Sequence, residues 1–373
     1  MGPGGGFRLR GLVKAGFAWV LQRTGADARI GDLTDARRFR LVVGYHRVVE
    51  DFATAARQAI PAMLTSRRML ERHLDWIGRR FRVISLDELG SRLECGEGFD
   101  TPVAAITFDD GYRDVYHQAF PLLKRKGLPA AVFVVTDLIG TSDVPLHDTL
   151  YHLFARAFAR WRSTRELADA LRGLGLPGPL ADMAARTKHP LAAMRRLFTT
   201  LPQAEMHRAI EALEGELGVE EAAMDGFRPL SWEMLAEMQR GGITIGSHTK
   251  THVLLPNERW RKVLEETSGS RQELERRLGR AVRHFAYPDG RFDAATVKAV
   301  ATSGYRFGYT TCRHRDRLYP LLTIPRTLLW EKSCVDALGR FSPAIMSCHA
   351  NGVFRGDCGQ YHRVSGNRGA PRR

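Results

Sequence analysis

Long apolar runs are scarce near the N-terminus of this sequence. Only eight residues separate Lys14 from Arg23, too few to cross a bilayer, and no small-residue cleavage site follows an apolar core. Residues Phe7–Arg23 instead place apolar side chains at helical spacing among basic ones, which predicts a basic amphipathic helix. Such a helix lies on an anionic membrane surface or packs on its own domain, and the sequence leaves both open. We expect a cytoplasmic protein, with peripheral contact to the inner membrane as the alternative.

Cysteines are few and irregularly spaced. The five cysteines form no Cys-x-x-Cys pair, and their odd number argues against a disulfide framework. This usage is compatible with a reducing compartment.

Acidic residues are outnumbered, 41 against 56 basic ones, which gives a formal net charge of +15. A charge of this sign attracts acidic surfaces such as anionic lipid, an acidic polymer or nucleic acid. The arginines are scattered, however, and no compact basic patch with interleaved aromatic residues is present. We therefore expect no nucleic-acid partner.

The sequence does contain a repeated alternation of strand and helix patterns. Short apolar runs at Leu41–Tyr45, Val103–Ile106, Ala130–Val135 and Ile243–Ser247 are separated by segments of helical periodicity. This alternation predicts an α/β fold with a parallel sheet or barrel.

The predicted domain organisation has four parts. Residues 1–38 form the N-terminal helix and a linker, and residues 39–340 form the α/β domain. Between about residues 141 and 229 no strand pattern appears, which predicts a helical insertion that acts as a lid, a substrate platform or a loop elaboration. Residues 341–373 lack periodicity and are expected to form an irregular tail.

Two adjacent carboxylates end the strand at Val103–Ile106. Neighbouring strand residues point to opposite faces, so the side chains of Asp109 and Asp110 are expected to diverge, one toward a metal and one toward a proton. Asp-Asp-Gly is also ordinary turn chemistry, and this motif alone does not decide between the two interpretations.

A second motif follows the strand at Ile243–Ser247. His248 and His252 are four residues apart, which on a helical turn brings both imidazoles to one metal ion. Two histidines and one carboxylate form a common facial metal site, and Asp110 would complete it. In a parallel barrel such residues share the face at the carboxyl ends of the strands, where sites are built.

Two further strand ends carry polar residues. Tyr287-Pro288-Asp289-Gly290 follows a strand but is also plain turn chemistry. His46 follows the strand at Leu41–Tyr45, and a lone histidine there is more often structural than catalytic.

Taken together these motifs resemble a known family. Thr107–Gly111, His248–His252 and Tyr287–Gly290 are similar, in order and spacing, to the first three motifs of the polysaccharide deacetylases (carbohydrate esterase family 4, with a NodB-type homology domain). The opening Tyr45–Val48 also resembles that family. The resemblance covers about residues 40–330, interrupted by the insertion.

The resemblance implies a distorted (β/α) barrel and a divalent metal, usually zinc, used to remove N- or O-acetyl groups from a carbohydrate. By position, Asp109 is the general base, and Asp110, His248 and His252 bind the metal. The segment Tyr287, Pro288 and Asp289 is expected to contact the substrate, with the backbone around Tyr287 helping to hold the oxyanion.

Two features depart from the family pattern. The arginine that often orients the base in the third motif is replaced by Ala286, which leaves Arg283 as a distant candidate. The Leu-x-x-His motif that supplies the general acid has no counterpart after Leu321–Arg326, and His46 is our candidate for that role.

Three functions therefore compete. The first is a metal-dependent deacetylase acting on a polysaccharide or lipid-linked sugar. The second is a catalytically inactive carbohydrate-binding barrel, and the third is an amidohydrolase acting on a non-sugar amide. The sequence says nothing of the oligomeric state.

Overall fold

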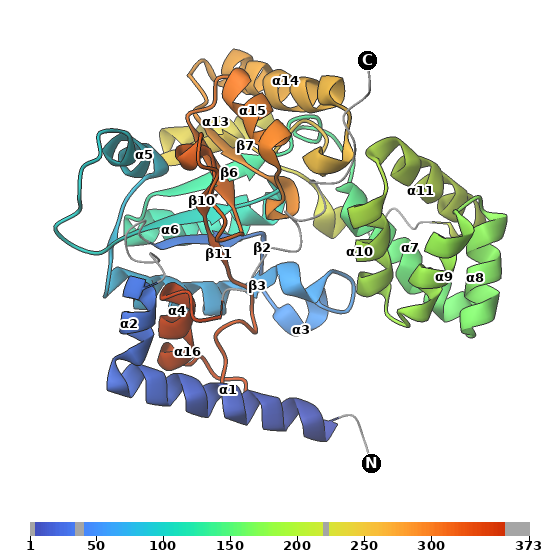
Figure 1. Cartoon of the computed structure of the whole chain (residues 1–373), viewed down its shortest axis with the longest axis horizontal. Helices are drawn as coiled ribbons and strands as arrows, with labels where there is room; N and C mark the ends of the chain where they lie inside the picture. The colour runs from blue at the N-terminus through green and yellow to red at the C-terminus, as the bar shows by residue number, and fades with distance from the viewer. Residues whose placement is uncertain (1–3, 34–40, 219–223, 355–373) are drawn as a thin grey trace.

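Parallel strands form a nearly closed barrel at the centre of the computed structural model, which describes residues 4–33, 41–218 and 224–354 (Figure 1). Around the barrel the strand order is β10-β9-β8-β7-β6-β5-β1-β11, and β4 pairs with β5. The bounds are β1 Leu41–Tyr45, β4 Arg82–Val83, β5 Val103–Phe108, β6 Ala130–Val134, β7 Ile243–Ser247, β8 His284–Ala286, β9 Phe307–Thr310, β10 Ile324–Pro325 and β11 Thr327–Leu328. The predicted distorted (β/α) barrel is confirmed.

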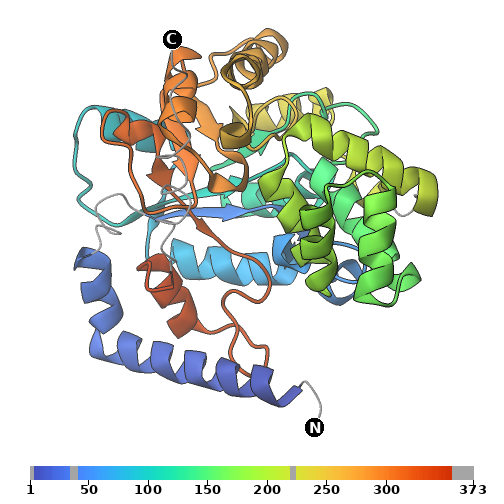
Figure 2. The ribbon, with the colours of Figure 1, turned by 45° about the vertical axis from the view of Figure 1, so that its right-hand side comes forward.

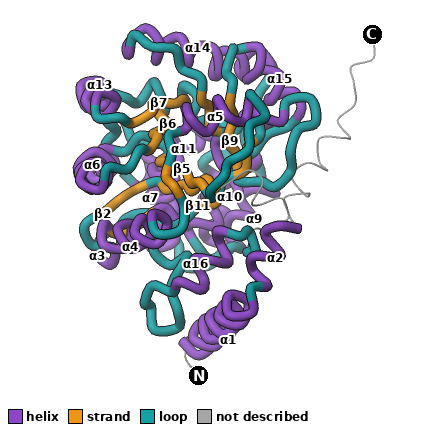
Figure 3. The backbone as a smooth tube through the Cα atoms, turned by 90° about the vertical axis from the view of Figure 1, so that its left-hand side faces the viewer, coloured by secondary structure: helices purple, strands orange, loops and turns teal. Residues whose placement is uncertain are grey.

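Helices surround this barrel, and Figure 3 shows strands enclosed by helical segments. Buried apolar residues on both faces of the strands form the core, as expected for a parallel sheet. Between the terminal helices and apart from the insertion, these α-helices are α3 Phe52–Ala55, α4 Arg67–Gly78, α5 Leu86–Glu94, α6 Phe120–Lys126, α13 Trp232–Arg240, α14 Trp260–Leu278 and α15 Ala294–Thr302. Two short strands, β2 Arg47–Val49 and β3 Leu64–Ser66, pair with each other beside the barrel.

A single segment supplies both closing strands of the barrel. Its first part, β10, pairs with β9, and its second part, β11, pairs with β1. Arg326 stands between them, and its amide donates a hydrogen bond of 2.7 Å to the carbonyl oxygen of Thr310. The approach depends on Gly308 in β9, because a Cβ there would lie 2.3 Å from the carbonyl oxygen of Leu322. The barrel closure therefore fixes Arg326 at the rim.

The predicted insertion is helical and has its own core. It contains α7 Leu146–Arg160, α8 Thr164–Gly173, α9 Gly178–Arg186, α10 Pro190–Thr200 and α11 Gln203–Leu217. Buried leucine, alanine and phenylalanine side chains pack these helices together, and Figure 1 shows them beside the barrel with α10 nearest to it.

The two terminal parts of the described chain pack on one another. Helix α1, Gly4–Thr24, continues through α2, Ala26–Leu33, and lies against α16, Pro343–Ala350 (Figure 2). The expectation of an irregular tail from residue 341 is therefore wrong for α16. Ser342 caps this helix by accepting a 3.3 Å hydrogen bond from the amide of Ile345, and Pro343 occupies the first turn, where a missing N–H costs nothing. Within the described ranges no helix is long and apolar enough to span a membrane.

Candidate active site

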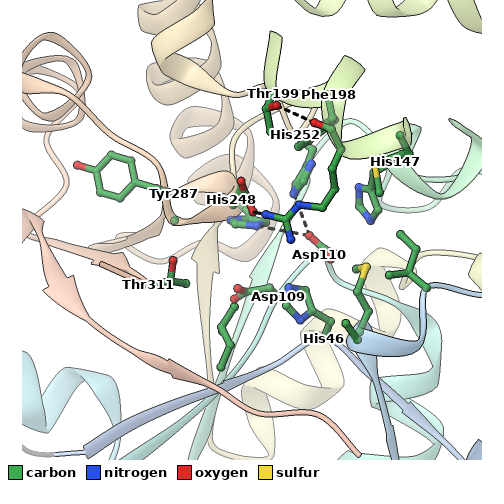
Figure 4. Close-up of a pocket in the computed structure, with 18 of the residues that line it drawn as sticks. His46, Asp109, Asp110, His147, Phe198, Thr199, His248, His252, Tyr287 and Thr311 are labelled. Atoms are coloured by element: carbon green, nitrogen blue, oxygen red, sulfur yellow. Dashed lines mark hydrogen bonds and ion pairs between the residues drawn. The ribbon is translucent and has the colours of Figure 1, made fainter. Parts of the chain in front are cut away.

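The polar residues that follow the strands meet at one end of the barrel. His46 follows β1, Asp109 and Asp110 follow β5, and His248 and His252 follow β7. All five line a cavity of about 240 Å³, and Figure 4 shows their side chains pointing toward one another. This is the end of a parallel barrel at which catalytic residues are usually found.

Asp109 is held by an arginine that sequence reasoning did not identify. Arg326 Nη1 lies 2.6 Å from Asp109 Oδ1, and Nη2 lies 2.7 Å from Oδ2, so the ion pair is bidentate. Arg326 is 1% exposed, whereas Arg283, our distant candidate, is exposed and precedes β8 at the other end of that strand. Burial alone would raise the pKa of Asp109, but the guanidinium of Arg326 together with the nearby His248 and His46 lowers the pKa below its ordinary value. Asp109 is therefore ionised at neutral pH.

Whereas Asp109 pairs with Arg326, its neighbour Asp110 lies beside the two histidines. It adopts a left-handed backbone conformation with φ of 71°, and Gly111 follows with φ of 75°. Asp110 Oδ1 lies 3.4 Å from His248 Nε2 and 3.2 Å from His252 Nε2. The motif therefore forms a turn, and this turn places Asp110 beside both histidines.

These three side chains fit a divalent metal. Asp110, His248 and His252 each offer one ligand atom, and these atoms lie within 4.8 Å of one another. Neither oxygen of the buried Asp110 accepts a hydrogen bond from the described residues, which is costly unless a cation satisfies it. Burial lowers the pKa of His248 to about 4, so its imidazole is neutral at pH 7, as a metal ligand must be.

The tautomer of His248 also suits metal binding. Its Nδ1 lies 2.8 Å from the carbonyl oxygen of Ala286, which can only accept, so Nδ1 carries the proton. Nε2 is then free on the side of Asp110. A backbone carbonyl that orients a histidine in this way is common around metal sites.

The segment between the two histidines is a loop, and the helical turn assumed from their spacing is wrong. Thr249 and His252 have φ of 70° and 62°, which no α-helix contains. The loop is tied to itself by a 2.9 Å hydrogen bond from the His252 amide to Thr249 Oγ1. The histidines converge because the chain reverses between them.

Two buried side chains support this loop from outside. Glu266 of α14 accepts 2.9 Å hydrogen bonds from the amides of Lys250 and Thr251, and its other oxygen accepts one of 2.7 Å from the Thr251 hydroxyl. Gln203 of α11 donates from Nε2 to the carbonyl oxygen of Thr251 at 2.9 Å. The loop that carries both histidines is therefore positioned jointly by the barrel and the insertion.

Comparison with known proteins assigns the chain to a family. The polysaccharide deacetylase family matches the chain over residues 96–176 and 182–308, more than half of its length. The chain belongs to the polysaccharide deacetylase family. The curated protein YxkH of Bacillus subtilis (strain 168), named as a polysaccharide deacetylase, is 21% identical over 246 residues, 66% of this chain. The chain covers 58% of the length of YxkH.

Solved structures share the fold. The Streptococcus pyogenes deacetylase PplD in complex with acetate is 17% identical, covers 82% of this chain and 96% of its own, and has a TM-score of 0.51. IcaB from Ammonifex degensii is 20% identical, with a TM-score of 0.51 and coverage of 83% and 96%.

A fourth histidine, His147, enters the site from the insertion. It begins α7, is buried, and its ring centroid lies 4.9 Å from that of His252. Its Nε2 lies 2.9 Å from the hydroxyl of Tyr112, which also donates to Asp148. No sequence pattern identified His147, because it lies in the helical insertion and outside every motif.

One face of α10 forms another wall of the same cavity. Its lining side chains are mostly apolar, and Arg195 Nη2 lies 3.7 Å from Asp289 Oδ1 across the cavity. The α10 residues involved are Leu191, Met194, Arg195, Phe198 and Thr199. The insertion therefore contributes to the site.

The prediction for Tyr287 needs correction. The backbone around Tyr287 was expected to help hold the oxyanion, but the Tyr287 amide donates a 3.0 Å hydrogen bond to the carbonyl oxygen of Tyr309, and Pro288 has no amide proton. The Tyr287 side chain is buried and points away from the cluster of histidines in Figure 4. Tyr287 and Asp289 both line the cavity. The sheet ladder thus uses the Tyr287 donor that was expected to face the substrate.

Replacing Arg326 should destabilise the protein. In Arg326→Met the buried carboxylate of Asp109 loses its bidentate partner, and we expect the free energy of unfolding in urea to fall by about 3–5 kcal/mol. Arg306→Met, which removes an exposed ion pair to Glu94, is the control and should cost at most about 1 kcal/mol. Equal effects of the two substitutions would contradict the role given to Arg326.

The loss of stability in Arg326→Met should grow as the pH rises. In the wild type the lowered pKa of Asp109 makes its stabilisation complete above the unfolded pKa of about 3.9, and the stabilisation is lost as the pH falls through the folded pKa. Without Arg326, burial raises the pKa of Asp109, so the charged form is penalised as the pH rises. The difference in stability should therefore widen between about pH 3 and pH 6, and a constant difference would contradict the assignment.

Removing Glu266 should weaken metal binding. Glu266→Ala leaves two loop amides without acceptors and frees the segment that carries His248 and His252. We expect the affinity for Zn²⁺, measured by calorimetry, to fall by about 10–100-fold. Glu265→Ala is the matched control, because Glu265 is its exposed neighbour on α14 and pairs only with lysine side chains. Unchanged zinc affinity in a folded Glu266→Ala protein would contradict this.

Proposed function

We propose that this protein is a metal-dependent hydrolase that removes acetyl groups from a sugar of a polysaccharide or a lipid-linked saccharide. Family membership supports the carbohydrate and acetyl part of this proposal. The observation that carries it is the buried Asp110. Its oxygens accept no hydrogen bond from the part of the chain that the structure describes, and it lies between His248 and His252 and next to an ionised Asp109.

Asp110, His248 and His252 would hold the metal, for which Zn²⁺ is our expectation because two imidazoles and one carboxylate suit it and leave positions open. When bound, this ion would polarise the acetyl carbonyl and lower the pKa of the attacking water. Burial would raise the pKa of Asp110 by itself, but the imidazole of His252 lowers it well below its usual range. The carboxylate is therefore ionised at neutral pH, as binding a cation requires.

Asp109 would accept the proton of the attacking water. A general base must be ionised and fixed within reach of that proton, and the guanidinium of Arg326 provides both conditions. Each carboxylate oxygen retains a lone pair beyond the one that faces Arg326. The lowered pKa also makes Asp109 a weaker base.

His46 remains our candidate for the acid that protonates the leaving group. It lines the cavity beside both aspartates and is only half-buried. His147 is less suitable, because burial and the nearby His252 lower its pKa to about 3 and it is therefore neutral at pH 7. In this proposal His147 forms part of the cavity wall next to His252.

Acetate release tests the proposed function. Purified protein with Zn²⁺ should release acetate from N-acetylglucosamine oligomers. A parallel assay with O-acetylated sugars shows whether the protein hydrolyses amides, esters or both. Asp109→Asn should lower kcat by about 10²–10⁴-fold, with zinc affinity retained. Asp137→Asn, an aspartate that follows β6 but does not line the cavity, is the control and should keep full activity.

Two other outcomes would replace this function. Sugar binding without acetate release would identify an inactive carbohydrate-binding barrel. Release of acetate from simple aryl amides, but from no sugar, would identify an amidohydrolase with a non-sugar substrate.

The pH profile distinguishes the two histidines. His46→Gln should lower kcat by about 10²-fold or more and remove the basic limb of the profile, because that limb reports the essential acid. His147→Gln should keep the basic limb and change kcat less. The reverse result would assign the acid to His147.

A further inference from the structure

Helix α1 presents an apolar face to solvent. Val13, Phe17 and Val20 are 64%, 52% and 50% exposed, and their spacing of four and three residues places them in one stripe. Trp19, 56% exposed, lies beside that stripe with the guanidinium carbon of Arg23 5.5 Å from its ring. Elsewhere in the described chain the large exposed apolar residues are Trp260, Leu318 and Leu338, which do not share a helix. Single exposed residues are ordinary, but a contiguous patch indicates a binding surface.

The opposite face of α1 is firmly attached to the protein. Ala18 is fully buried against Ala344, Ile345 and Cys348 of α16. Lys14 Nζ donates a 2.9 Å hydrogen bond to the carbonyl oxygen of Ser333. Figures 1 and 2 show α1 running along the edge of the molecule, with its length clear of the barrel. The exposed stripe therefore belongs to a fixed helix and cannot fold back onto the barrel.

A cationic groove adjoins this region. It is a cavity of about 650 Å³ between α4 and the turn at residues 334–342, and Arg68, Arg72, Arg79 and Arg340 line it. None of these four guanidinium groups has an ion-pair partner among the described residues. The two carboxylates in the lining are already engaged, Asp75 by Lys126 at 2.6 Å and Glu331 by the amide of Ser66 at 2.7 Å. We call this cavity the α4 groove.

The α4 groove and α1 are linked through the same turn. Ser333, which accepts from Lys14 of α1, directly precedes it, and Phe341 near its end lies 5.6 Å, ring to ring, from His73 of α4. Arg340 and the exposed Leu338 lie within this turn. An apolar stripe and a set of unpaired guanidinium groups therefore belong to one connected part of the protein.

We propose that this part of the protein docks on a membrane rich in anionic lipid, with the stripe of α1 in the interface and the α4 groove on lipid phosphates. Arginine binds phosphate oxygens bidentately, and a basic helix with a partly apolar face lies in the plane of the interface. A second copy of the chain is a poorer occupant, because each copy carries a net charge of +15 and would present the same unpaired arginines. The docking does not depend on the proposed catalytic function.

Sedimentation with vesicles tests the apolar contact. The full chain should pellet with phosphatidylcholine vesicles that contain phosphatidylglycerol, and not with pure phosphatidylcholine vesicles. Phe17→Ser with Val20→Ser should lower the partition coefficient at least tenfold, whereas Trp260→Ser, an exposed aromatic on α14, should not. Thermal unfolding of each variant confirms that it is folded.

The same assay tests the α4 groove. Arg68→Gln with Arg79→Gln should lower the partition coefficient at least fivefold, and the salt dependence of binding should become shallower. Arg165→Gln with Arg259→Gln removes the same charge from exposed positions outside the groove and should have a smaller effect.

Three results would overturn the proposal. The first is equal binding of the stripe variant and its control, or no binding to anionic vesicles. The second is a dimer in sedimentation equilibrium that the stripe variant abolishes, which would identify a second copy as the occupant. The third is binding of inorganic phosphate in the groove without any binding of vesicles, which would identify a soluble anion as the ligand.

Discussion

The ion pair between Asp109 and Arg326 is the interaction on which barrel and site both depend. A buried carboxylate and a buried guanidinium are each unfavourable alone, and their bidentate contact makes both tolerable. Arg326 reaches Asp109 only because the segment that carries it pairs with β9 on one side and β1 on the other. The segment that closes the barrel therefore also fixes the candidate base, Asp109.

Backbone conformation is the second constraint on the site. Five non-glycine residues in the described chain have positive φ, and four of them lie in the loops that follow β5, β7 and β8. These are Asp110, Thr249, His252 and Asp289. Each costs of order 1–3 kcal/mol and persists only when its surroundings hold it there. Around Thr249 and His252, that support comes from Glu266 and Gln203, whose side chains satisfy the loop backbone.

Two additions extend the barrel in different directions. The helical insertion closes one side of the cavity with α10 and introduces His147 beside His252, so the insertion is part of the site as well as of the fold. The α1 and α16 pair lies on another side of the molecule and contributes nothing to that cavity. The residues of the proposed active site and those of the proposed membrane contact therefore do not overlap.

The sequence by itself determined the barrel and most of the site, because short-range patterns encode them. Buried strands appear as apolar runs, and the motifs at their ends, taken together with the family resemblance, predict Asp109, Asp110, His248 and His252 as site residues. Only the tertiary structure decided the rest. Arg326 and His147 come from segments without a motif and meet the site through long-range packing, which no local spacing records. The loop between His248 and His252 was misjudged as a helical turn, since the same four-residue spacing suits both forms. The sheet pairing that occupies the Tyr287 amide, and the exposure of one face of α1, likewise depend on which neighbours the folded chain brings close.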